Sequence, residues 1–333
     1  MSFSEKMFEL AGAMNKSLVL PEGTEPRTLR AARIVADRHI AKMVYLVGAP
    51  DKIKRAADEV DVSLDGLHIV DPAASKWLDA YAEAYHSMRR HKGLSLEEAR
   101  IKITDPVSWG AMMVHRGDAE AMVAGAASAT AKVLVAGFTI IKTAPGVKSA
   151  SSCFVMDFPD KHWGKDGMMI FSDCATIPEP TAEQLSEITI ASAASCRTYL
   201  QTDPIVAMLS FSTKGSASHP LIEKVLEALK MVKQKEPNLI VDGELQLDAA
   251  IVPAVGLKKA PRSPVAGKAN TLIFPDLQAG NIGYKIAQQF SKAGAYGPFL
   301  QGFNKPISDL SRGASVDDIV NTCAVTLTQV KSG

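Results

Sequence analysis

The chain has 333 residues, of which 47% are apolar and 22% charged, and its formal net charge is +1. A chain of this length buries a full core and predicts two domains rather than one. The balanced charge, without a long lysine or arginine run, argues against a nucleic-acid partner, because such binding depends on clustered neutralisation of phosphates. Any anionic ligand must therefore be met by local charge.

The cysteine pattern and the amino terminus indicate a cytoplasmic protein. The four cysteines show no CxxC pair and no metal-ligand spacing, so we expect reduced, mostly buried thiols. The first residues are acidic and lack an apolar stretch of signal length, so secretion is not expected. The most membrane-like run, residues 121–141, contains Lys132 and many small residues, and we expect a strand, loop and helix inside the protein rather than a membrane span.

Short apolar runs rich in Val, Ile and Leu alternate with helical patterns from "KSLVLPEG" onward, which predicts an α/β fold of parallel strands and crossover helices. A second series of this kind begins near Ser149. In it we assign "NLIVDGELQLDAAIVP" and "NTLIFPD" to strands and "KKAPRSPVAGKAN" to a loop. A domain junction is expected near Pro145 and Gly146.

Common cofactor and catalytic signatures are absent from this sequence. No two of the 23 glycines lie two positions apart, which excludes GxGxxG, and GxxxxGK[ST], HExxH and GxSxG are also missing. The seven histidines are scattered at spacings that suit no metal site. We therefore expect an enzyme without a bound metal, working through hydroxyls, arginines and carboxylates.

Polar residues gather in three segments that follow strand-like runs. Ligands of open α/β sheets bind beyond the carboxyl ends of strands, where helix N-termini present free N–H groups to anions. These segments favour a long anionic ligand, although plain turns or tight packing of small residues would give the same composition. The candidate binding residues are Ser128, Thr130, Lys142 and Thr143, then Ser212 and Thr213, and then Asn281, Tyr284 and Lys285.

The segment "SDLSRGASVDDIV" presents a turn, residues 311–313, directly before the last helix. Ser315 and Asp318 have the Ser-x-x-acid spacing of a capping box, which stabilises a helix N-terminus. Arg89 lies near the end of another helix, where cations commonly interact with the helix dipole. Taken alone, both features favour structural roles.

Several blocks nevertheless resemble the phosphate acetyltransferase (phosphotransacetylase) family, among them "YHSMRRHKGLSLEEA", "VAMLSFSTKGSA" and "YGPFLQGFNKPISDLSRGASVDDIV". The likeness runs from "LVLPEG" to the last helix, which is nearly the whole chain. It implies two α/β domains with an active-site cleft between them, an overall fold similar to that of isocitrate dehydrogenases, and a homodimer. Domain I would comprise residues 1–145 plus 303–333, and domain II, the expected dimerisation domain, residues 146–302.

The resemblance also implies a reaction, the reversible transfer of acetyl between acetyl phosphate and CoA, with both as substrates and no tightly bound cofactor. Placed on this sequence, the family's general base falls on Asp318, its transition-state hydroxyl on Ser311, and its phosphate-binding arginines on Arg312 and Arg89. The CoA-binding candidates are Asn281, Tyr284, Lys285 and Gly302. The substrate-binding candidates are Ser128, Thr130, Lys142, Thr143, Ser212 and Thr213.

One departure from the family pattern concerns the helix before "IIKT". The family usually has an active-site arginine and a proline where this chain has Val135 and Ala136. The loss removes a permanently charged, bidentate phosphate contact, and we hypothesise that Lys132, one turn earlier, replaces it.

Two alternatives remain open at this stage. In the first alternative, the enzyme transfers a propionyl or butyryl group rather than acetyl. In the second, the chain is a catalytically silent module that senses acyl-CoA on the same fold. Comparing acyl phosphates decides the first alternative. Binding of acetyl-CoA without phosphate exchange would support the second.

Overall fold

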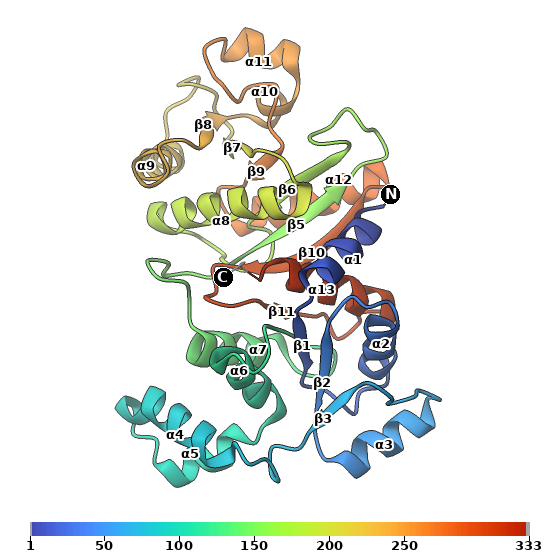
Figure 1. Ribbon diagram of the computed structural model, residues 1–333. Helices are drawn as coiled ribbons and strands as arrows, with labels where there is room; N and C mark the ends of the chain where they lie inside the picture. Colours follow the sequence, from blue (N-terminus) through green and yellow to red (C-terminus); the bar gives the residue numbers. More distant parts are fainter. Residues whose placement is uncertain (1, 331–333) are drawn as a thin grey trace. The chain divides into compact units, whose positions relative to one another are not determined.

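The computed structural model describes residues 2–330, and its contacts divide the chain into two compact units, residues 1–144 with 303–333 and residues 145–302. Each unit is built around its own sheet, with helices between most successive strands (Figure 1). The expected α/β class is confirmed. Within the described residues, no helix has the length and apolarity needed to cross a membrane.

The first unit contains a five-stranded parallel sheet in the order β11-β4-β1-β2-β3. Its strands are β1 (Ser17–Leu20), β2 (Met43–Val47), β3 (His68–Val70), β4 (Ala121–Ala124) and β11 (Ile307–Asp309). Its α-helices are α1 (Phe3–Met14), α2 (Pro26–Asp37), α3 (Pro50–Glu59), α4 (Leu78–Arg89), α5 (Leu96–Ile103), α6 (Pro106–Arg116), α7 (Thr130–Ala136) and α13 (Val316–Thr328). A 3₁₀ turn, η1 (Arg90–Lys92), follows α4, and a π-helical turn, η2 (Gly137–Ile141), follows α7.

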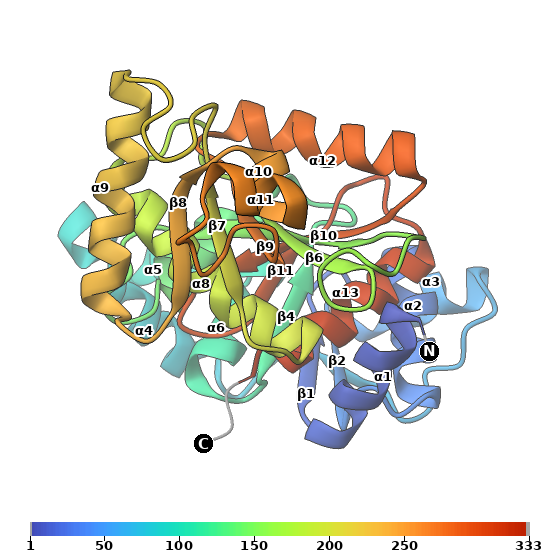
Figure 2. The same cartoon turned by 90° about the horizontal axis from the view of Figure 1, so that it is seen from above.

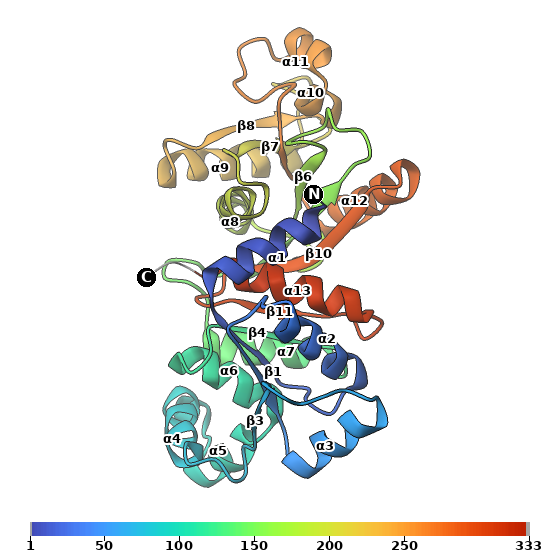
Figure 3. The ribbon, with the colours of Figure 1, turned by 45° about the vertical axis from the view of Figure 1, so that its right-hand side comes forward.

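The central strands of this sheet, β1 and β4, are buried along their whole length. Helix α6 packs on one face of the sheet and α2 on the other (Figures 1 and 3). Parallel strands covered on both faces read as continuous apolar runs, which explains "LVL" and "AMVA" in the sequence. Figure 3 also shows α1 lying against α13, where Phe3, Met7 and Ala11 bury one helical stripe.

The second unit contains a six-stranded mixed sheet in the order β10-β5-β6-β9-β7-β8. Its strands are β5 (Ser151–Asp157), β6 (Met168–Ser172), β7 (Ile205–Leu209), β8 (Ile240–Leu245), β9 (Thr271–Ile273) and β10 (Gly294–Gln301). Its helices are α8 (Ala182–Leu200), α9 (Pro220–Lys235), α10 (Leu247–Ile251), α11 (Pro253–Lys259) and α12 (Leu277–Ser291). Figure 2 shows α12 running along the outside of this unit.

Two expectations for the second unit are wrong. Strand β5 pairs antiparallel with both β6 and β10. For β6 the reason is the connection, which is a loop without the crossover helix that a parallel pair needs. The stretch assigned to strands at "NLIVDGELQLDAAIVP" forms β8 and then the short helix α10. Its apolar run is too short for periodicity to distinguish strand from helix, and burial of the consecutive residues Ala249 and Ala250 fits the helix.

Candidate active site

The turn after β11 presents its side chains to solvent at the carboxyl end of the parallel sheet. Ser311, Arg312 and Gly313 are exposed, and the Ser311 Oγ accepts a hydrogen bond from the Gly313 N–H at 3.2 Å. That bond uses a lone pair of the hydroxyl and leaves its hydrogen available to a ligand. Strand β11 lies beside β4, so the turn shares the edge of the sheet where α/β proteins bind ligands.

Asp318 combines a capping role with a free carboxylate oxygen. Its Oδ2 accepts from the Ser315 N–H at 2.9 Å and the Ser315 Oγ at 2.8 Å, and its own N–H donates to Ser315 Oγ at 3.1 Å. The expected capping box is therefore present. Because both bonds end on Oδ2, the exposed side chain keeps Oδ1 for another proton or donor.

Within the described chain, neither of the two arginines predicted to bind phosphate has a carboxylate partner. Across residues 2–330, no carboxylate lies within ion-pair distance of Arg312, and none lies within that distance of Arg89 at the end of α4. Arg89 is half-buried and Arg312 exposed. Such forked, permanently charged groups suit bidentate contacts with phosphate.

The loop after β4 is occupied by a carboxylate of the chain itself. Glu22 accepts hydrogen bonds from four successive backbone N–H groups, those of residues 125–128, at 2.6–3.1 Å. Successive N–H groups of this kind form an anion-binding nest, and here the anion is Glu22. The Ser128 N–H is thus committed, while Thr130 begins α7 and its side chain bonds to the Asp309 carboxyl.

Asp309 is a half-buried carboxyl that the sequence analysis missed. It ends β11, and its Oδ1 is shielded from solvent without a hydrogen-bond partner among the described residues. Burial raises the pKa of Asp309 to about 6, with a further rise from the nearby Glu22 charge and an opposing hydrogen bond from Thr130. The available signal was an acidic residue at the end of a short strand, two residues before Ser311.

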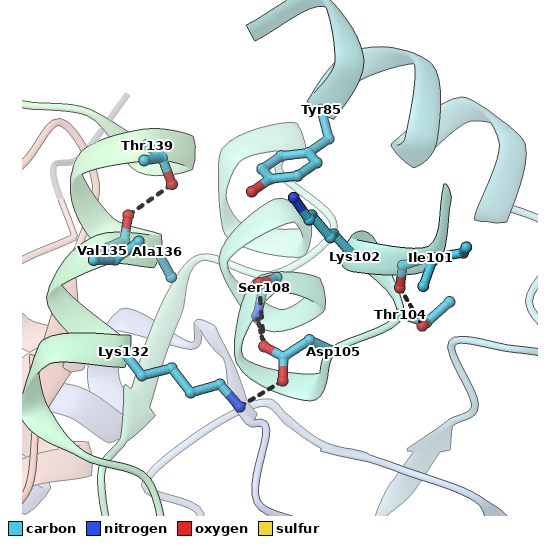
Figure 4. Close-up of a pocket in the computed structure, with 10 residues that line it drawn as sticks. All are labelled: Tyr85, Ile101, Lys102, Thr104, Asp105, Ser108, Lys132, Val135, Ala136 and Thr139. Carbon is cyan, nitrogen blue, oxygen red and sulfur yellow. Dashed lines mark hydrogen bonds and ion pairs between the residues drawn. The ribbon is translucent and has the colours of Figure 1, made fainter. Parts of the chain in front are cut away.

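A pocket of about 430 Å³ opens between the end of α5, α6 and α7 (Figure 4). Its lining includes Tyr85, Lys102, Ser108 and Val135, and Val135 is 59% exposed. Lys132 also faces the pocket, but its Nζ pairs with Asp105 Oδ1 at 2.5 Å. The Lys132 ammonium thus already has one carboxylate partner, and its remaining N–H donors are available to a ligand.

The end of η2 places the last two candidates of the first unit. Lys142 has a positive φ of 65° and an exposed side chain, and its carbonyl accepts the Asn304 N–H at 2.9 Å. Thr143 forms an isolated antiparallel bridge with Phe303. These contacts join the segment before residue 145 to the segment that returns at residue 303.

In the second unit, the hydroxyls of Ser212 and Thr213 are used internally. The Ser212 Oγ donates to Glu244 Oε1 at 2.9 Å, and the Thr213 Oγ1 bonds to the side chain and the N–H of Gln246. Both residues are almost fully buried. Glu244 also accepts the Gly215 N–H at 2.7 Å, so a carboxylate occupies this loop too.

The candidates on α12 and after β10 differ in whether their side chains already have partners inside the protein. Asn281 donates from Nδ2 to the Cys174 carbonyl at 3.0 Å, and the Tyr284 ring stacks on Phe154 at 4.2 Å between centroids. The Lys285 Nζ lies 5.9 Å from the Tyr284 ring centroid and has no ion pair within residues 2–330. Gly302 follows β10 with a φ of 89°, a conformation that favours glycine.

The cysteine thiols are buried, and burial keeps two of them protonated. The four cysteines are free and buried as expected, and burial raises the pKa of Cys153 to about 12 and that of Cys196 to about 11, so both stay protonated. The described part of the chain contains no group of three or more His, Cys, Asp or Glu residues that could hold a metal ion. The turn at residues 311–318 is therefore the best-formed candidate site.

Comparison with known proteins adds a consistent result. Residues 2–327 match the family model "Phosphate acetyl/butaryl transferase". A phosphate acetyltransferase from Treponema pallidum is 54% identical over 99% of both chains. Among solved structures, a phosphotransacetylase from Streptococcus pyogenes superimposes with a TM-score of 0.93 at 38% identity, covering 99% of each chain. The EutD phosphotransacetylase from Staphylococcus aureus gives 0.91 at 37% identity, covering 98% of this chain and 99% of its own.

Proposed function

This chain belongs to the phosphate acetyl and butyryl transferase family, and from that membership we propose that it reversibly transfers acetyl between acetyl phosphate and CoA. One observation carries the proposal furthest. The turn at residues 311–313 places an available hydroxyl and an unpaired guanidinium a few residues before Asp318, a carboxylate with a free oxygen. A base, a hydrogen-bond donor and an anion ligand are the groups that acyl transfer to a thiol needs.

In the proposed reaction, Asp318 removes the thiol proton of CoA while sulfur forms a bond to the acetyl carbonyl carbon. The bond from that carbon to the bridging phosphate oxygen then breaks, and its electron pair leaves with phosphate. A thiol with a pKa of about 8.5 is mostly protonated at neutral pH, and only the thiolate attacks well. A carboxylate within reach therefore speeds the step by taking the proton as sulfur closes on the carbonyl.

The other groups stabilise charge and position the substrates. Ser311 donates a hydrogen bond to the developing oxyanion or to the CoA sulfur, while Arg312 and Arg89 hold the phosphoryl group. Because acetyl phosphate is already activated, much of the acceleration comes from holding two anionic substrates in attack geometry.

CoA contacts are proposed for Lys285, Tyr284, Asn281 and Gly302. Of these, Lys285 has the strongest support, because its ammonium group keeps no carboxylate partner in the described chain and attracts phosphate. Substrate contacts are also proposed for the side chains of Lys142, Thr143, Ser128 and Thr130, whereas Ser212 and Thr213 would first have to release Glu244 and Gln246.

We also propose a homodimer formed through the second unit. Ile282, Ile286 and Phe290 recur every four residues along α12 and are 53–88% exposed. They form one stripe, on a different face of the helix from Asn281 and Tyr284, and Lys285 lies at the border of the stripe beside Ile282. An apolar stripe of this size is better covered than left in water. Sedimentation of Phe290→Asp beside the unmutated protein tests the proposal, and an unchanged dimer would remove α12 from the interface.

The decisive experiment measures phosphate release from acetyl phosphate that depends on CoA. We expect Asp318→Asn to lower kcat by about 10²- to 10⁴-fold, the usual range for loss of a general base. Asp317→Asn is the matched control, because it removes a neighbouring exposed acid of the same helical turn and should retain the rate. Equal rates for the unmutated protein and Asp318→Asn would remove the base assignment.

The same assay separates the alternatives. Propionyl and butyryl phosphates that turn over faster than acetyl phosphate would move the assignment to a longer acyl group. The exposed Val135 in place of a family arginine favours a silent acyl-CoA sensor as the second candidate. That candidate predicts acetyl-CoA binding without any exchange of phosphate.

A further inference from the structure

Arg27 makes an unusual set of bonds from the first turn of α2. Its Nη1 donates to the carbonyls of Arg312 and Ala314, each at 2.8 Å, and its Nη2 donates to the Ala126 carbonyl at 2.8 Å. Its Nε donates to Glu25 Oε1 at 2.7 Å. Four of the five N–H groups of the guanidinium are thus used inside the protein.

These bonds connect two loops that are far apart in sequence. Ala126 follows β4, whereas Arg312 and Ala314 follow β11, and the two strands are neighbours in the parallel sheet. Glu25 fixes the donor itself, because its other oxygen accepts the Thr28 N–H at 2.8 Å and caps α2. The guanidinium is therefore anchored to a helix start and holds both loops from there.

The turn has weak tethers of its own. The Gly313 N–H bonds to Ser311 Oγ and the Ala314 N–H bonds to the Ser311 carbonyl, and both bonds lie within the turn. Neither fixes the turn to the sheet. Charge-assisted bonds from a planar fork are stronger and more directional than such neutral contacts.

We propose that Arg27 is a positioning residue for the site after β11, where it fixes the backbone of residues 312–314 so that Arg312 and Ser311 meet the substrate in one geometry. The proposal rests on the proposed function of this turn. Arg27 acts through Arg312 rather than on reacting atoms, because four of its five N–H donors are already used by three carbonyls and Glu25.

A double-mutant cycle in the CoA-dependent assay tests this coupling. We expect Arg27→Met to lower kcat by about 10²-fold, the effect of misplacing a catalytic group by about 1 Å. In an Arg312→Ala background the same substitution should add little, because the group that Arg27 positions is already gone. Arg27→Lys keeps the charge but not the fork, and should recover only part of the rate.

Arg33→Met is the matched control. Arg33 lies on the same helix and also donates to a carbonyl, that of Asp65 at 2.5 Å, far from the turn in sequence. It should leave kcat and both KM values unchanged. Full additivity of Arg27→Met with Arg312→Ala, or an unmutated rate in Arg27→Met, would overturn the proposal.

Hydrogen–deuterium exchange supplies an arm that does not depend on activity. Arg27→Met should speed exchange of the amides at residues 313–318 by about tenfold, in line with loss of bonds from a charged donor, and should leave residues 63–67 unchanged. Arg33→Met should give the reverse pattern. If the unmutated protein transfers no acetyl group, the proposed function fails, and this arm still decides whether Arg27 orders the turn: unchanged exchange there would reject it.

Discussion

The loop after β4 and the turn after β11 lie on neighbouring strands at the same edge of one sheet, yet they differ in what remains available to a ligand. In the loop, four backbone N–H groups all point to Glu22. In the turn, the Arg312 guanidinium has no carboxylate partner within the described chain, and Asp318 keeps one oxygen free. The first region is an anion nest filled by Glu22, whereas the second keeps side-chain groups available to a ligand.

Position and composition do not by themselves make a binding site. Both segments follow a parallel strand and precede a helix, where a ligand is expected. The loop of the second unit at residues 212–216 repeats the filled arrangement through Glu244. A strand end can bind a ligand only where donors or acceptors keep no partner inside the protein.

Among the changes that compare these two regions, removal of the unpaired Arg312 guanidinium should have the largest effect. Arg312→Ala should raise the KM for acetyl phosphate and lower kcat, with a loss in kcat/KM of about 10³-fold, because a preorganised charge on the leaving phosphate is removed. Steady-state kinetics of phosphate release measures both constants. Arg116→Ala, at the end of α6, removes an arginine outside the turn as a control. Unchanged constants would retire the phosphate role of Arg312.

The second-largest effect is expected from removing the Glu22 carboxylate from the loop after β4, and it should lower the stability of the fold. Glu22→Ala leaves four N–H groups without their acceptor and should lower the free energy of unfolding by about 3 kcal/mol. Denaturant unfolding gives this value. Acetate or sulfate should then raise the stability of the variant more than that of the unmutated protein, since an anion can occupy the vacated nest. Equal responses to the anion would show that the loop collapses instead.

Asp309 between these regions should make stability depend on pH. The pKa of the Asp309 carboxyl is about 6 in the folded protein, above its ordinary value of 3.8, so the native state binds the carboxyl proton more tightly than the unfolded state does. The free energy of unfolding therefore falls as pH rises from about 4 to about 6. Asp309→Asn should therefore be more stable than the unmutated protein at pH 8 by roughly 2 kcal/mol. The advantage should shrink as pH falls through 6 and vanish below about 4. A constant difference across this range would contradict the burial of the charge.

The smallest effect is expected at the pocket in Figure 4. Val135→Arg should lower the KM for acetyl phosphate by about fivefold, because an exposed charge adds less than about 1 kcal/mol. Val135→Gln controls for side-chain length without charge. An unchanged KM would indicate that another group, with Lys132 the first candidate, already supplies the contact.

The local sequence predicted the helix start at the site better than it predicted how distant strands pair. The capping box at Ser315 and Asp318 follows from a local spacing of three residues, and it is present. The alternation of strands and helices correctly gave the α/β class. Local patterns failed where the partner is distant, as at β5, whose apolar run is the same in a parallel or an antiparallel pair.

No local sequence pattern predicts the hydrogen bonds that Glu22 accepts or those that Arg27 donates. Glu22 lies 103 residues before Gly125, and Arg27 lies 285 residues before Arg312. Both belong to the segment "PEGTEPR", whose composition reads as a turn followed by a helix start.

The fold class, the helix caps, the family and the residue types that a thiol acylation would use can all be predicted from the amino-acid sequence, because each depends on local periodicity or on matched blocks. Which groups keep no partner is visible only in the folded chain, where Glu22 fills one loop, Arg27 connects two loops and Asp309 is half-buried between them. Hydrogen bonds and burial join segments that are distant in sequence, and local patterns do not indicate which distant segments meet.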